Sequence, residues 1–349
     1  MKFIQLTDKV KTCCSAHETL YFVKNRELYK IQDHESVSTG VTFQNDLQEL
    51  KFDTTLFIND TAGKGILIEA GEAHPIDYYL LAQLSDDQLL VSFRDPDNKR
   101  MTGILDRTTG AIVKGIAETS LIFKVHRSFL YQYNRRSRVI ECFSLVNDND
   151  ANWQFNLSSL SELTVQDVNN PDNDTEVIKL TGVLDNKLWV ALNHHTLIAL
   201  DAQTGELIYQ LSAIPELQSA WLPSAIPAPE AMVVDEKRNK LIGFMWEFYW
   251  EVDPATGSIE LTDLTADLKP LNIRNDMSGY VFTDTHIFFA SHNQSGIGGF
   301  HIEKKILDWH YTFTKNEQGE IPRIKEIKGN EQIIGAVDAG GNLYVFETE

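Results

Sequence analysis

Residues 197–211 read LIALDAQTGELIYQL, a pattern of two half-buried strands joined by a tight turn. Apolar and polar residues alternate on both sides of the DAQTG break, which is the period of strands with one buried face. Within the break, the side chains of Asp201 and Thr204 can hydrogen-bond the backbone of the turn. Gly205 can adopt the positive φ that closes a hairpin without a Cβ clash. We therefore interpret these polar residues as parts of a turn rather than as a ligand site.

The same D-x-x-T-G turn occurs three times in the chain. The other copies lie in GILDRTTGAIVKGI at 103–116 and in YWEVDPATGSIEL at 249–261. Three copies indicate an internal structural repeat. We assign the same structural role to all the matching turn residues, which are Asp106, Gly110, Asp201, Thr204, Gly205, Asp253, Thr256 and Gly257.

A second hairpin precedes each copy, and related hairpins run through the whole chain. The clearest is KLWVALNHHTLIAL at 187–200. The others lie at 19–31, 55–70, 88–105, 128–143, 240–252, 286–302 and 332–346. Eight hairpins in 349 residues give 349/8, or about 44 residues per unit, which is the length of a four-stranded propeller blade.

The repeat predicts an all-β fold, a single β-propeller domain over residues 1–349 with four-stranded antiparallel blades. We favour eight blades; seven is the alternative, because 71–87 is short for the two strands that it must hold. The last unit supplies three strands, so we expect residues 1–7 to join the last blade and close the ring. The units are expected near 8–44, 45–80, 81–117, 118–157, 175–213, 229–265, 278–314 and 323–349 plus 1–7.

The bulk composition limits the partners and the compartment. The 31 Lys and Arg against 50 Asp and Glu give a formal charge of −19, which repels nucleic acid and anionic membranes. The N-terminus lacks the apolar core of a signal peptide, and no run of about 18 apolar residues occurs, so we expect a cytoplasmic protein.

Cys13, Cys14 and Cys142 are too few for a disulfide framework. Adjacent His194 and His195 cannot easily share one ion, and we expect no metal, no cofactor and a monomer.

The opening stretch resembles the repeat of the quinoprotein-like propellers, often called PQQ-like repeats. Their pattern is A-x-D-x-x-T-G followed by Trp four residues after the Gly, and here Ala199 precedes the turn and Tyr209 replaces the Trp. Trp153 and Trp309 fill that aromatic position in two degenerate copies. The resemblance covers the period of the whole chain and implies a propeller, WD40-like in architecture. The family contains cofactor-dependent dehydrogenases and non-catalytic scaffolds, and the chain lacks the evident marks of the dehydrogenases, so the non-catalytic branch is favoured.

The topology of a propeller predicts on which face of the domain each turn and connector lies. Turns between second and third strands share one face with the connectors between blades, and two long connectors are expected at 158–174 and 213–230. The turn in MWEFYW at 245–250 is aromatic where small residues are usual. We predict a partner-binding patch over blades four to seven, with simple packing of the tryptophans as the alternative. Its residues are Trp221, Trp246, Phe248, His194, His195, His292, Arg135, Arg136, Arg138 and Arg274.

These observations favour a non-catalytic scaffold that recognises another protein, one basic enough to be steered by the negative charge. An antidote or immunity protein that inhibits a basic toxin is one variant of this hypothesis. The alternative is an enzyme or small-ligand binder with a site in the central channel. Its candidate residues on the inner strands are Lys124, Lys179 and Cys13.

Overall fold

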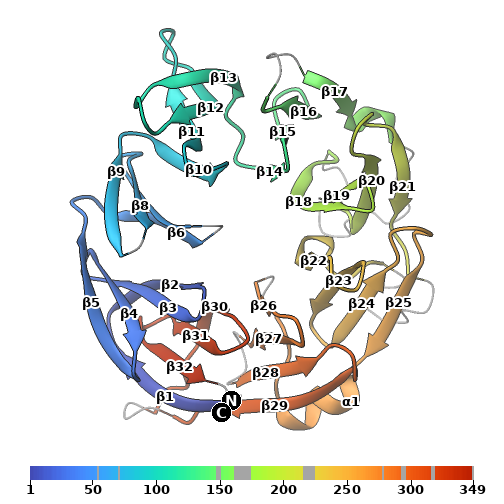
Figure 1. Ribbon diagram of the computed structural model, residues 1–349. Helices are drawn as coiled ribbons and strands as arrows, with labels where there is room; N and C mark the ends of the chain where they lie inside the picture. The colour runs from blue at the N-terminus through green and yellow to red at the C-terminus, as the bar shows by residue number, and fades with distance from the viewer. Residues whose placement is uncertain are drawn as a thin grey trace. The chain divides into compact units, whose positions relative to one another are not determined.

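The structure, a computed structural model, describes residues 1–52, 55–69, 71–146, 151–160, 174–214, 225–276, 279–291, 296–315 and 319–347. In these residues the chain forms eight four-stranded antiparallel sheets (Figure 1). Within each sheet, strands that follow one another in the sequence are neighbours, apart from the N-terminal strand. The fold is an eight-bladed β-propeller. The predicted eight blades are confirmed, and the seven-blade alternative is wrong.

The chain folds into two compact units. The first unit comprises Met1–Phe93, Leu105–Val113 and Thr265–Glu349, and the second comprises Arg94–Ile104 and Lys114–Leu264. The first unit contains β1 (Lys2–Thr7), β2 (Val10–Ala16), β3 (Thr19–Lys24), β4 (Glu27–Gln32), β5 (Glu35–Thr42), β6 (Leu47–Phe52), β7 (Leu56–Asp60), β8 (Gly65–Glu69), β9 (Glu72–Ile76), β26 (Val281–Phe282), β27 (His286–Ala290), β28 (Gly296–His301), β29 (Ile306–Thr312), β30 (Ile324–Gly329), β31 (Ile333–Asp338) and β32 (Leu343–Glu347).

The second unit contains the sheets of the fourth to sixth blades. Its strands are β14 (Phe123–His126), β15 (Phe129–Asn134), β16 (Val139–Ser144), β17 (Ala151–Asn156), β18 (Val177–Leu184), β19 (Lys187–Leu192), β20 (Thr196–Asp201), β21 (Leu207–Leu211), β22 (Met232–Asp235), β23 (Lys240–Met245), β24 (Phe248–Val252) and β25 (Ile259–Asp263). The third blade takes residues from both units, in β10 (Tyr79–Gln83), β11 (Gln88–Arg94), β12 (Arg100–Asp106) and β13 (Ile112–Glu118).

In the residues that the structure describes, helical structure is confined to single turns. The described helices are α1 (Thr265–Leu268) and three 3-10 turns, η1 (Leu157–Ser159), η2 (Pro229–Ala231) and η3 (Lys269–Leu271). In the described part of the chain, no helix has the length and apolar character needed to cross a bilayer.

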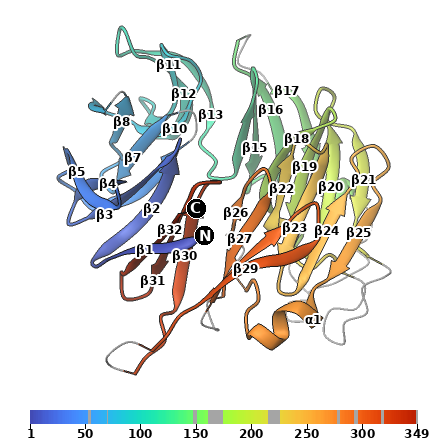
Figure 2. The ribbon, with the colours of Figure 1, turned by 60° about the horizontal axis from the view of Figure 1, so that its bottom comes forward.

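The N-terminal strand completes the last blade, as the strand count predicts. β1 pairs antiparallel with β32, from Lys2 opposite Glu347 to Thr7 opposite Leu343. Figures 1 and 2 show the two ends of the chain beside each other. Because β32 is hydrogen-bonded on both sides, its backbone groups are satisfied within the blade.

The short segment that left the blade count open holds two strands of five residues each, β9 and β10. Two residues separate them, Asp77 and Tyr78. A strand of five residues is an ordinary length. The eighth blade was therefore hard to recognise because both strands are short and their connector is minimal, rather than because a strand is missing.

The three D-x-x-T-G turns each join the third strand of a blade to the fourth. In the opening stretch, Asp201 Oδ1 accepts the backbone N–H groups of Gln203 at 2.8 Å and Thr204 at 2.9 Å. Gly205 has φ of 76° and donates its N–H to the Asp201 carbonyl at 2.9 Å. In the turn at Asp106, the Thr109 N–H likewise donates to Asp106 Oδ1, at 2.8 Å. This hydrogen bond lowers the pKa of the Asp106 carboxyl, because it stabilises the charged form. The carboxylates therefore act within their own turns.

The aromatic residue of the repeat binds the turn of the next blade. Trp153 on β17 lies against Gly205, where a Cβ would sit 2.6 Å from the Trp153 ring, and its Nε1 donates to the Ala202 carbonyl at 3.1 Å. Tyr209 on β21 lies against Gly257 in the same way and donates its hydroxyl to the Ala255 carbonyl at 2.6 Å. These contacts give the aromatic position of the motif a packing role between adjacent blades.

Candidate functional site

Seven of the ten residues predicted for the binding patch lie in the second unit. Trp221 and His292 fall outside the described residues, and Arg274 belongs to the first unit. The seven occupy three turns between second and third strands, at 135–138, 193–195 and 246–247, together with the first residue of β24. The predicted placement in turns of that class agrees with the strand bounds for six of the seven, whereas Phe248 belongs to β24.

A connector between two blades holds two of these turns together. Arg135 forms an ion pair with Glu176 at 2.9 Å, and Arg138 forms one with Asp174 at 2.9 Å. From the next blade, the Asn193 N–H donates to the Glu176 carbonyl at 3.0 Å, and Asn193 Nδ2 donates to the Asp174 carbonyl at 2.7 Å. The turns of blades four and five therefore share one end of the second unit with the connector.

The third turn lies at the same end of its own blade. His195 Nδ1 lies 2.9 Å from the carbonyl of Ile226, in the connector that leads into β22. Trp246 follows β23 at the end where β22 begins, since Met232 pairs with Gly243. Trp246 is half-buried in a two-residue turn with φ of 54°, whereas Phe248 at the start of β24 is buried.

Two further apolar residues lie at this end of the second unit, and no sequence pattern predicts them as part of a binding surface. Leu121 is 79% exposed and lies in the connector before β14. The Tyr133 N–H donates to the Ile122 carbonyl, and this bond places the connector beside the 135–138 turn. Ile178 is exposed at an irregularity of β18, beside Glu176. A lone Leu in a short connector looks like any other loop residue, so only its exposure in the structure distinguishes it.

We call this surface of the second unit the arginine face. It consists of Leu121, Arg135, Arg136, Arg138, Ile178, His195 and Trp246. Arg135 and Arg136 have side chains 77% and 89% exposed although each has an acidic neighbour. Exposed ion pairs contribute little to stability, so these guanidinium groups can exchange their present partners for those of another protein.

The inner-strand candidates for a channel site have structural contacts. Lys179 on β18 donates to the Glu230 carbonyl at 2.9 Å and to the Met232 carbonyl at 2.7 Å, both in the next blade. Burial, followed by the nearby Lys124 charge, lowers the pKa of Lys179 to about 8. Burial raises the pKa of Cys13 well above its usual value, so its thiol is protonated and a poor nucleophile near neutral pH.

Lysines on other first strands make the same kind of bond to the neighbouring blade. In the first unit, Lys11 on β2 donates to the Leu47 carbonyl of β6 at 2.9 Å. Lys51 on β6 donates to the Leu81 carbonyl of β10 at 3.3 Å. Lys11, Lys51 and Lys179 therefore have a structural role between neighbouring blades.

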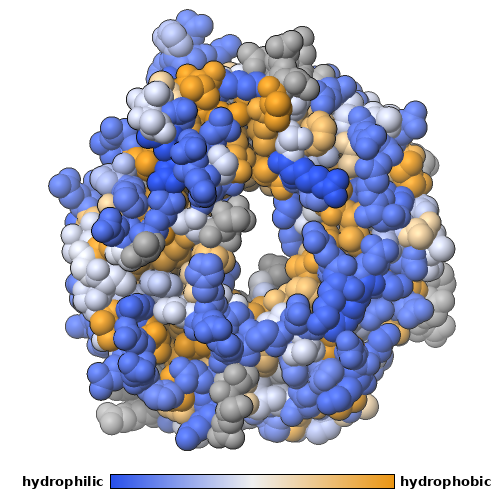
Figure 3. Space-filling view, in the orientation of Figure 1, coloured by the Kyte–Doolittle hydropathy of each residue, from blue (hydrophilic) through white to orange (hydrophobic). Residues whose placement is uncertain are grey.

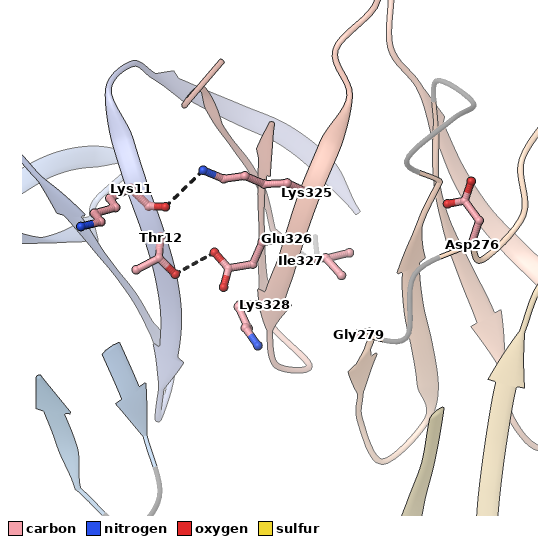
Figure 4. Close-up of a pocket in the computed structure, with 8 residues that line it drawn as sticks. All are labelled: Lys11, Thr12, Asp276, Gly279, Lys325, Glu326, Ile327 and Lys328. Carbon is pink, nitrogen blue, oxygen red and sulfur yellow. Dashed lines mark hydrogen bonds between the residues drawn. The ribbon is translucent and has the colours of Figure 1, made fainter. Parts of the chain in front are cut away.

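The first unit also contains a cavity of about 650 Å³, lined by residues of β2 and β30 together with Asp276 and Gly279. Figure 4 shows Glu326 pointing from β30 toward Thr12 on β2, and the Lys325 ammonium pointing toward the Lys11 carbonyl. Lys328 extends from the same strand as Glu326. The lining residues are Lys11, Thr12, Asp276, Gly279, Lys325, Glu326, Ile327 and Lys328.

The described residues contain no group of three or more His, Cys, Asp or Glu side chains placed to hold a metal ion. Cys13, Cys14 and Cys142 are buried free thiols. The face seen in Figure 3 is mainly hydrophilic, with scattered hydrophobic residues.

Comparison with known proteins gives the fold and no family. No protein-family model matches the sequence, and no curated protein matches it. Among solved structures, the computationally designed Ika8 protein has a TM-score of 0.62 at 9% identity, covering 98% of this chain and 96% of its own. BamB from Moraxella catarrhalis has a TM-score of 0.57 at 13% identity, with 100% and 99% covered. Sqt1 from Saccharomyces cerevisiae has a TM-score of 0.58 at 11% identity, with 100% and 98% covered.

These likenesses extend over the full chain at very low identity, so they establish a β-propeller. The similarity to BamB, a PQQ-like propeller, agrees with the resemblance of the repeat at the level of the fold. Because propellers carry many unrelated functions, the function must be argued from the residues of this chain.

Proposed function

We propose that the protein is a non-catalytic recognition module that binds a basic protein through the arginine face. The observation that carries the proposal is the exposure of Leu121 beside Arg135 and Arg136 at one end of the second unit. Protein interfaces combine apolar anchors with arginine, and such residues dominate the binding energy. Half-buried Trp246 adds an aromatic anchor at the same end of its blade.

The overall charge supports a basic partner. A net charge of −19 accelerates encounter with a positively charged protein and repels an acidic one. Glu118, Asp174 and Glu176 lie next to the arginines and become available when the arginines turn toward a partner. The arginine face therefore offers both signs of charge around an apolar contact.

The test is affinity capture from the native host, followed by measurement of the purified partner's Kd. Leu121→Asp should weaken binding by about tenfold or more, because it removes an apolar contact and places a charge in the interface. Arg136→Ala should also weaken binding, because it removes the guanidinium donors and the packing of the arginine side chain. Neither variant should change the melting temperature, since both side chains are exposed.

Val146→Asp is the matched control. Val146 is 75% exposed on the same blade, beyond the end of β16 that pairs with the start of β15, away from the 135–138 turn. It should leave the Kd unchanged. If Leu121→Asp binds as well as the wild type, or if Val146→Asp weakens binding equally, the arginine face is not the interface.

A further inference from the structure

Three lysines line the cavity at β2 and β30. They are Lys11, Lys325 and Lys328, within a protein whose net charge is −19. Figure 4 shows the Lys11 ammonium pointing away from β30. In the described residues none of the three forms an ion pair with a carboxylate. Such a concentration of unpaired cations is unusual in so acidic a chain, because the surrounding charge favours ion pairing.

The three lysines differ in how far the protein uses their donors. Lys11 donates one hydrogen bond to the Leu47 carbonyl, and Lys325 donates one to the Lys11 carbonyl. Each ammonium has three N–H donors, so two remain on each. Within the described part of the chain, no hydrogen bond engages the Lys328 ammonium.

The carboxylates of the cavity are occupied by other groups of the protein. Glu326 Oε2 accepts the Thr12 hydroxyl at 2.7 Å and the Cys13 N–H at 3.4 Å. Asp276 lies 4.0 Å from the Arg274 guanidinium and is almost fully buried. The lining therefore carries three lysine charges against the two carboxylates of Glu326 and Asp276, which leaves a net positive charge.

We propose that this cavity binds a small, multiply charged anion, a phosphate or a di- or tricarboxylate, held by Lys328 with help from Lys325. The cavity volume of about 650 Å³ lies within the usual range for small-molecule sites. The proposal is independent of protein binding at the arginine face, which belongs to the second unit.

The test is isothermal titration of the full-length protein at low ionic strength with inorganic phosphate and, separately, with citrate. Saturable binding of at least one of them is expected, and the comparison distinguishes phosphate from carboxylate chemistry. Lys328→Gln should weaken binding by about tenfold, because it removes one charge-assisted hydrogen bond. Lys328→Arg should retain binding.

A change of opposite sign sharpens the test. Glu326→Gln keeps an oxygen that can accept the Thr12 hydroxyl but removes a negative charge, so it should bind the anion several-fold more tightly. Lys304→Gln, on an exposed turn outside the cavity lining, is the matched control and should bind like the wild type. No saturable binding of either anion, or equal weakening in Lys328→Gln and Lys304→Gln, would overturn the proposal.

Discussion

Two separate requirements place a glycine in the turn of the opening stretch. Gly205 has a positive φ, which sequence reasoning anticipated from the turn chemistry. It also leaves the space that the Trp153 ring of the preceding blade occupies. The second requirement had no local signal, because it depends on a residue about 50 positions earlier in the chain.

Gly205→Ala and Gly110→Ala should separate these two requirements. Gly110 has φ of 69° and no heavy atom within 4 Å of a Cβ, so its substitution should cost about 1 kcal/mol of backbone strain. Gly205→Ala should cost about 2 kcal/mol or more, because the new methyl group also collides with Trp153. Denaturant melts of both variants measure the difference, and equal losses would show that the Trp153 contact is easily displaced.

Lys179 should make stability depend on pH in the alkaline range. Its folded pKa of about 8 lies below the usual 10.5, so between these values the unfolded chain binds more protons than the folded one. The free energy of unfolding should therefore rise from pH 8 to pH 10 in the wild type relative to Lys179→Met. Lys124→Gln removes the nearby positive charge and should move the onset of this rise to higher pH. A difference between wild type and Lys179→Met that stays constant with pH would contradict the lowered pKa.

At the scale of elements, the fold depends on one strand that is distant in sequence from its blade. β1 covers the edge of β32, and Trp309 Nε1 donates to the Met1 carbonyl at 2.9 Å. The incomplete last unit predicted this pairing, because an open sheet edge is unfavourable. The first strands gave less information, since Lys11, Lys51 and Lys179 bind carbonyls of the neighbouring blade that the sequence pattern does not reveal.

Deletion of residues 1–7 should lower the melting temperature and promote self-association. It exposes the backbone groups of β32 and removes the Phe3 contact with Phe346. Size-exclusion chromatography and thermal melts measure both effects. A synthetic peptide MKFIQLT should restore part of the stability by adding the missing strand. A monodisperse deletion variant with the melting temperature of the full chain would show that β1 is dispensable.

At the scale of the whole molecule, the net charge of −19 is the dominant property outside the fold. Like charges repel more strongly in the compact state than in the unfolded chain, and salt screens this repulsion over about 10 Å at 0.1 M. The same charge supports the basic partner that we propose. It also makes the cationic cavity of the first unit stand out from the rest of the chain.

The melting temperature should therefore rise between about 10 mM and 200 mM sodium chloride, by a few degrees. Potassium chloride should produce the same rise, because screening depends on ionic strength rather than on the identity of the cation. Differential scanning calorimetry provides the measurement. A melting temperature that falls with salt would mean that attractive ion pairs outweigh the net repulsion.

The eight-bladed fold, the class of each turn and the closing strand were predictable from the sequence alone. The physical reason is that alternation and turn chemistry operate over a few residues, and their repetition adds up along the chain. The apolar residues of the arginine face and the cavity were decided only by tertiary structure. Leu121 belongs to the arginine face because it is exposed beside the 135–138 turn. The hydrogen bond from Thr12 to Glu326 joins residues 314 positions apart. Exposure and pairing of this kind depend on which blades become neighbours, and no local pattern records that.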